Sequence, residues 1–207
     1  NIAATLVLLP FRNGLVKIAT LTIRDDEEEE AKTGLDVLDE RFLERPAFAI
    51  AQAKKASVDM ANASSEALML AIDLIENFDK KTAKRVSELE EMVDHYEDEV
   101  GTYLMKLSNA DLSVRDSQTV SLMLHCIGDF ERISDHACNI METAEKVNKK
   151  EEHFSDKAKE ELRIYENAIR EIVNMTCTVF DTEDVKLATQ VEPLEEVIDT
   201  LNDEVKK

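Results

Sequence analysis

The chain is poor in residues that break regular structure, with 4 glycines, 3 prolines and no tryptophan among 207 residues. So few turn-forming residues exclude a β-sandwich or barrel, which needs many turns between short strands. The 3 cysteines are widely spaced and odd in number, so we expect no disulfide framework and a reducing compartment. The sequence also lacks a Gly-x-Ser-x-Gly motif, a His-Glu-x-x-His motif and a glycine-rich phosphate loop, and we expect no enzyme.

The charge is strongly one-sided. Against 45 Asp and Glu residues stand only 25 Lys and Arg residues, which gives a formal net charge of −20. Such a surface repels phosphates, so nucleic acid is excluded as a partner. It suits cations, either metal ions or basic protein surfaces. Most of these acids are expected only to solvate long helices.

An apolar stretch opens the chain, and its densest part is Ile2–Leu9. Three basic residues follow that part: Arg12, Lys17 and Arg24. Apolar residues followed by basic ones are typical of a membrane helix that ends on the cytoplasmic side. We therefore expect residues 1–24 to be the end of a membrane segment and an interfacial stretch; an ordinary buried helix is the alternative. The acidic run 25–30 then indicates a linker, so residues 25–46 are interpreted as a linker with a lead-in segment.

From residue 47 onward the pattern is helical throughout. In the second predicted helix the apolar residues recur at alternating steps of three and four, which is typical of a helix in a bundle. A break is expected near Glu192, with the helix restarting at Pro193. The predicted helices span 48–77, 82–107, 114–149 and 157–180, and a fifth begins after Thr182.

Two segments of the chain resemble each other. Residues 86–100 and 191–205 are identical at eight of fifteen positions, and the acidic residues match in register. This similarity predicts an all-α antiparallel helical bundle built from two three-helix repeats. The first repeat would span 47–150. The second, 151–207, would be incomplete, with its sixth helix expected after Lys207.

Carboxylates recur four residues apart, in the pattern Glu-x-x-x-Asp. Residues at this spacing lie on one face of a helix, where like charges repel unless a cation joins them. The spacing alone favours a solvated helix face over a metal site. The pairs are Glu90/Asp94, Glu131/Asp135 and Glu195/Asp199.

The segment 129–140, Asp-Phe-Glu-Arg-Ile-Ser-Asp-His-Ala-Cys-Asn-Ile, resembles the L-E-R-I-G-D-H-A-x-N-I signature of PhoU-like domains. It departs from the signature at Phe130, where the family has Leu, and at Ser134, where it has Gly. The resemblance covers residues 47–207 and implies a six-helix bundle of two three-helix repeats. It also implies that iron, zinc or similar divalent ions bind the acidic pairs. That assigns a metal-binding role to six residues: Glu90, Asp94, Glu131, Asp135, Glu195 and Asp199.

A second resemblance concerns the lead-in. Residues 38–47 resemble the start of the PhoU-like domain in bacterial sodium-dependent phosphate cotransporters, and residues 1–23 are similar to the end of their membrane part. The resemblance implies a regulatory domain on the cytoplasmic side of the cell membrane. Its partners would be the membrane part of the same transporter, a further copy of the chain or a regulatory protein. Two alternatives stay open: a soluble PhoU-type regulator of phosphate uptake and signalling, and a structural helical bundle without a ligand.

Overall fold

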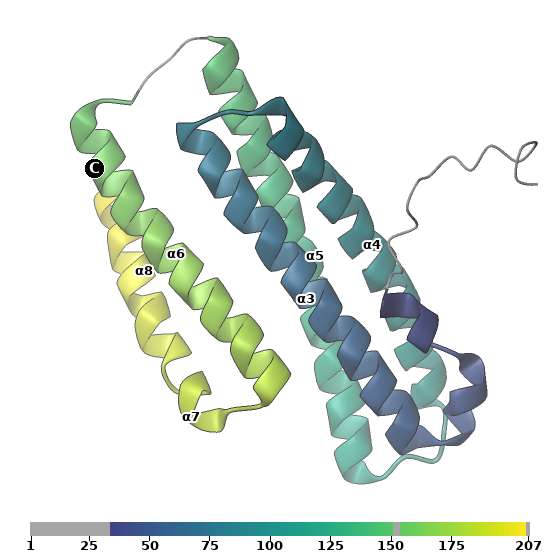
Figure 1. Cartoon of the computed structure of the whole chain (residues 1–207). Coiled ribbons are helices and arrows are strands. Elements are labelled where there is room, and N and C mark those ends of the chain that lie inside the picture. The colour runs from purple at the N-terminus through teal and green to yellow at the C-terminus, as the bar shows by residue number, and fades with distance from the viewer. Residues whose placement is uncertain (1–33, 151–153, 206–207) are drawn as a thin grey trace, which may run out of the picture. The chain divides into compact units, whose positions relative to one another are not determined.

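The computed structural model describes residues 34–150 and 154–205. This part of the chain is helical and contains no strand, which confirms the predicted all-α class. Figure 1 shows the elements in order. They are η2 (Gly34–Val37), η3 (Glu40–Glu44), α3 (Pro46–Glu76), α4 (Lys80–Ser108), α5 (Val114–Lys149), α6 (Asp156–Thr182), α7 (Val185–Ala188) and α8 (Val191–Val205).

Each long helix begins at a start signal that the sequence carries. Pro46 occupies the first turn of α3, where its missing N–H costs no hydrogen bond. The other three helices have side-chain caps, and a cap of this type contributes about 1 kcal/mol. These caps are Asp79, Ser113 and Ser155, which accept hydrogen bonds from the backbone N–H of Thr82, Asp116 and Ala158 respectively.

Helix α3 lies at the centre of the fold, with α4, α5 and α6 packed against it. Its buried positions are dominated by alanine, whose single methyl group lets neighbouring helices approach closely. Larger side chains from α4 and α5, such as Leu104 and Met123, supply the core volume. The buried alanines of α3 are Ala49, Ala53, Ala56, Ala61, Ala63, Ala67 and Ala71.

Helix α6 packs antiparallel to α3. The Lys54 ammonium near the start of α3 donates to the carbonyl of Phe180 near the end of α6. Further along α3, Asp73 accepts a hydrogen bond of 2.5 Å from Arg170 in the middle of α6. Numbers thus rise along α3 as they fall along α6, so the two helices run in opposite directions.

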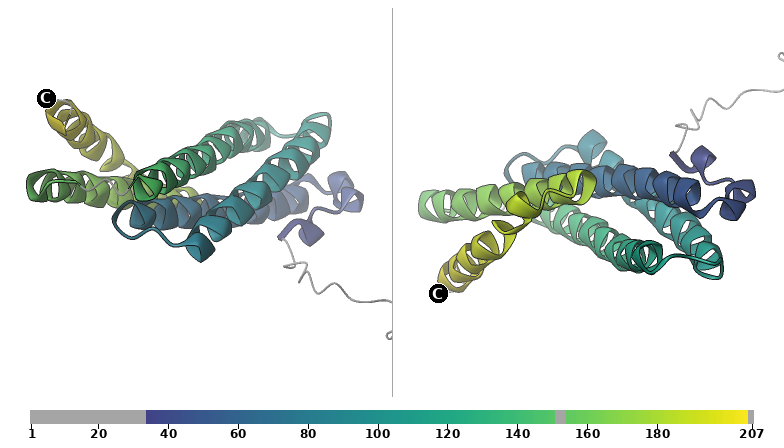
Figure 2. Two further views of the ribbon diagram at one scale, coloured as in Figure 1. Left: turned by 90° about the horizontal axis from the view of Figure 1, so that it is seen from above. Right: turned by 90° about the horizontal axis from the view of Figure 1, so that it is seen from below.

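After α6 the chain turns through the short α7, and α8 then packs back against α6. The chain leaves α6 through Glu183, whose left-handed φ of 56° ends the helix. A turn at residues 189–190 then separates α7 from α8. The break was predicted near Glu192, and the structure places it slightly earlier in the chain. Figure 2 shows that α8 diverges from α6 toward the C-terminal end. The equivalence of the α6–α8 pair with α3–α4 stays a prediction.

None of the helices between residues 34 and 205 that the structure describes is long and apolar enough to cross a bilayer. The predicted membrane segment, residues 1–24, lies outside the described residues. Residues 25–33 of the predicted linker also lie outside them.

The alanine packing of α3 yields a test. Replacing Ala53, which is fully buried, with Leu should destabilise the protein by about 1–3 kcal/mol, because the added carbons have no space between the helices. The same change at the exposed Ala51 is the control and should shift stability by less than about 0.5 kcal/mol. Chemical denaturation measures both. Equal effects at the two positions would contradict the close packing of α3.

Candidate functional site

Four of the six predicted metal ligands come from two helices that pack against each other. Glu90 and Asp94 lie on α4, and Glu131 and Asp135 lie on α5. We call these four residues the carboxylate patch. Glu90 and Glu131 are half-buried, whereas Asp94 and Asp135 are exposed.

The patch is placed by the buried stripes of its two helices. On α4, Glu90 and Asp94 each directly follow a buried core residue, Leu89 and Val93. A helix turns about 100° per residue, so the position after a core residue lies at the border between core and solvent. Glu131 and Asp135 take the same position on α5, directly after the buried Phe130 and Ser134.

Electrostatics show that the two pairs are close to each other. Partial burial raises the pKa of Glu90, and the negative charges of Asp94, Asp135, Glu91 and Glu131 raise it further. Two of these four charges, Asp135 and Glu131, come from α5. The packing of α4 against α5 therefore brings acids that are 41 residues apart in sequence into one electrostatic cluster.

The other members show the same behaviour. Burial raises the pKa of Asp94, with added repulsion from Asp135. Burial also raises the pKa of Glu131, and here Asp135 and Asp94 both contribute repulsion. At the edge of the patch, burial together with Glu90 and Asp135 raises the pKa of the Cys138 thiol to about 11. Without a bound metal, Cys138 is therefore a neutral thiol at neutral pH, which makes it a poor nucleophile.

The donor chemistry of the patch fits a hard divalent cation, because such ions prefer carboxylate oxygens. The side-chain positions are less favourable. Among the described residues, no three acidic, histidine or cysteine side chains lie close enough together to hold one ion. A cation would therefore require the exposed Asp94 and Asp135 to change rotamer, or would bridge the carboxylates in pairs.

The third predicted pair is separate from the patch. Glu195 and Asp199 are exposed on α8, which packs against α6 and α7. Neither residue is among the charges that raise the pKa of Glu90, Asp94 or Glu131. The structure thus brings four of the six predicted ligands together and leaves two apart.

One buried acid was missed at the level of sequence. Glu166 on α6 has a relative exposure of 9%, and it is the only buried residue of that helix in the part of the chain with described side chains. Its position gave a signal. Glu166 falls four residues after Leu162 and three before Ile169, at an apolar position of the α6 stripe.

Comparison with protein families supports part of the resemblance drawn from the sequence. Residues 58–144 match the family model of the PhoU domain. The match covers most of α3 and α5 and all of α4, so it includes the whole carboxylate patch. This part of the chain is similar to PhoU domains. Comparison with curated proteins and with solved structures returned no match.

The patch predicts a pH dependence of stability. The pKa values of Glu90, Asp94 and Glu131 are raised in the folded state, so the folded chain binds more protons than the unfolded chain just above their ordinary values of 4.5 and 3.8. Their contribution to stability should therefore increase as pH falls through this window and be lost as pH rises. Replacing Glu90 and Glu131 with Gln should stabilise the protein at about pH 7.5 more than at about pH 5.

Urea unfolding in the presence of a chelator measures this difference at the two pH values. The matched control replaces Glu99 and Glu171, which are exposed acids on α4 and α6, with Gln. The control should change stability equally at both pH values. A patch variant that behaves like the control would show that the four carboxylates do not interact.

Proposed function

We propose that this chain is the PhoU-like regulatory domain of a sodium/phosphate cotransporter and acts on phosphate transport from the cytoplasmic side of the membrane. The observation that carries the proposal is the PhoU domain match over residues 58–144. A domain of this family points to regulation of phosphate uptake. We propose no catalytic role.

The finer assignment to a cotransporter rests on the first 47 residues. An apolar stretch with basic residues after it, then an acidic linker and a lead-in similar to that of the cotransporters, favours a domain joined to a membrane part. In the lead-in, Asp39 caps η3 and pairs with Arg41. It contacts α4, where Lys106 pairs with Glu40.

In this proposal the carboxylate patch is the sensor. Glu90, Asp94, Glu131 and Asp135 would hold a divalent cation, which supplies positive charge that offsets their mutual repulsion. Because the patch joins α4 to α5, cation binding would tighten the contact between these helices. A change in that contact is a physical means of signalling to a partner, either the membrane part or a separate regulatory protein.

The metal role predicts a ligand-dependent stability. Added zinc, iron(II) or manganese should raise the melting temperature of the parent protein relative to chelator. A cation that binds only the folded state adds about 2.7 kcal/mol at a hundred times its dissociation constant. Replacing Asp94 and Asp135 with Asn should abolish this gain and leave the chelated protein equally or more stable, since repulsion is relieved.

Differential scanning calorimetry with chelator and with each metal compares the parent, this variant and a control with Glu99 and Glu171 changed to Gln. Both control residues are exposed acids outside the patch, on α4 and α6. The control should keep the metal response. If metal stabilises all three proteins equally, or none, the patch is a solvated helix face.

The membrane role predicts a difference between two proteins. Residues 1–207 should co-sediment with phosphatidylcholine vesicles, and residues 35–207 should stay in the supernatant, because only the longer protein carries the apolar stretch. Neutral vesicles avoid repulsion of the net charge of −20. Equal sedimentation would favour the soluble regulator. Coding sequence for several membrane helices upstream of Asn1 would support the cotransporter independently.

A further inference from the structure

A second acidic site lies between α3 and α6, outside the carboxylate patch. A cavity of about 480 Å³ opens between these helices. Its floor is apolar, with Leu70, Ile72 and Leu74 from α3. The polar residues that line it include Asp73, Glu76, Asn77, Glu166, Asn167 and Arg170.

Glu166 is the most constrained of these residues. It is nine-tenths buried, and its Oε1 atom is enclosed by protein without a hydrogen-bond partner. Burying a carboxylate without a compensating donor is costly, and such groups are rare in folded proteins. Glu166 lines the cavity, so a donor bound in the cavity would lie beside this side chain.

The surrounding charges do not compensate Glu166. Burial raises its pKa, and the negative charges of Glu76 and Asp73 raise it further, while Arg170 acts in the opposite direction. The hydrogen bonds of Arg170 go to Asp73 at 2.5 Å and to the carbonyl of Met69 at 3.4 Å.

The second arginine of the cavity, Arg163, is paired with Glu160 at 3.2 Å. Both arginines therefore have other carboxylate partners. The positive charges that line the cavity are therefore already paired with acids, and the cavity does not suit an anion.

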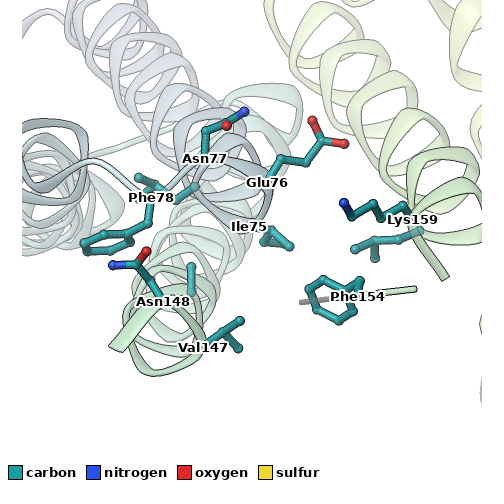
Figure 3. Close-up of a pocket in the computed structure, with 11 residues that line it drawn as sticks. Ile75, Glu76, Asn77, Phe78, Val147, Asn148, Phe154 and Lys159 are labelled. Carbon is teal, nitrogen blue, oxygen red and sulfur yellow. The ribbon is translucent and has the colours of Figure 1, made fainter. Parts of the chain in front are cut away.

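Figure 3 shows a neighbouring cavity at the end of α3, into which Glu76 and the ammonium of Lys159 extend from opposite sides. Lys159 does not line the cavity of Glu166, and its charge is not among those acting on that carboxylate. Glu76 borders both cavities, so it adds negative charge to the rim of the Glu166 cavity.

We propose that the cavity between α3 and α6 binds a primary ammonium group on an alkyl stem, with Glu166 as its buried anchor and Glu76 at the rim. A divalent metal fits less well, because it needs several charged oxygen ligands and Glu166 is the one buried carboxylate that lines the cavity. A guanidinium also fits less well, because a single buried carboxylate would leave most of its five N–H donors unpaired.

An ammonium has three donors that point in different directions. It can therefore use one oxygen of Glu166 together with Glu76 and a side-chain amide oxygen of Asn77 or Asn167, all of which line the cavity. The alkyl stem then contacts the apolar floor. The same chemistry is offered by a free alkylamine and by a lysine side chain of a partner protein.

The test is an NMR titration of the ¹⁵N-labelled chain with n-butylammonium chloride at constant ionic strength. Saturable shifts are expected at the side-chain amides of Asn77 and Asn167. Glu166→Gln should weaken binding about tenfold, which is the effect of losing one charge-assisted hydrogen bond. Glu171→Gln, which removes an exposed acid of the same helix, should bind as the parent does.

Two further probes complete the design. n-Butanol has the same stem without the charge and should give no saturable shift at these amides. Nα-acetyl-lysine N-methylamide distinguishes the sources: tighter binding than n-butylammonium assigns a protein lysine, and weaker binding assigns a free amine. Absence of binding by both amines, or equal binding by the parent and Glu166→Gln, overturns the proposal. Neither outcome depends on the metal response of the carboxylate patch.

Discussion

The close packing around α3 is the constraint on which the other features depend. A helix with large buried side chains would hold its neighbours apart, whereas the buried alanines of α3 admit α4, α5 and α6 on different sides. Helices α4 and α5 both pack against α3, and they also contact each other. That contact creates the carboxylate patch, and the contact of α6 with α3 creates the cavity of Glu166.

The two acidic sites differ in how strongly solvent screens their negative charge. In the carboxylate patch, Asp94 and Asp135 are exposed, so solvent and salt screen their repulsion and the cluster can persist without a ligand. Glu166 is enclosed, so screening is weak and the charge requires a proton or a donor nearby. In a chain with a net charge of −20, the buried acid is thus the stronger indication of a specific cation.

Helix type and limits followed from the sequence because they depend on local signals. Apolar spacing, Pro46 and the caps act within a few residues, and the family signature at 129–140 lies in the segment that the PhoU model matches. The spacing of Glu90 and Asp94 also fixed their common face. Their proximity to Glu131 and Asp135 depends on how α4 packs against α5, which no local pattern encodes. For the same reason the sequence did not show that Cys138 lies at the edge of the patch. The burial of Glu166 could have been predicted, because this acidic residue stands at an apolar position of the α6 stripe, but the sequence analysis did not use that pattern.

The two halves of the chain differ at an informative position. The dipeptide Phe78-Asp79 recurs as Phe180-Asp181, an offset of 102 residues that differs from the 105 of the later repeat, and at this offset Glu166 on α6 corresponds to Ser64 on α3. Ser64 is fully buried, but its hydroxyl donates to the carbonyl of Ala61 at 3.0 Å, so the helix itself satisfies it. A glutamate cannot be satisfied in that way, because an ionised carboxylate has no proton to donate to a backbone carbonyl. Replacing a self-satisfied serine by an enclosed carboxylate adds a requirement that α6 cannot meet alone, and the cavity beside it is where that requirement can be met. The second half therefore departs from the first in chemistry as well as in its helix contacts, and its role need not follow from the PhoU-like first half.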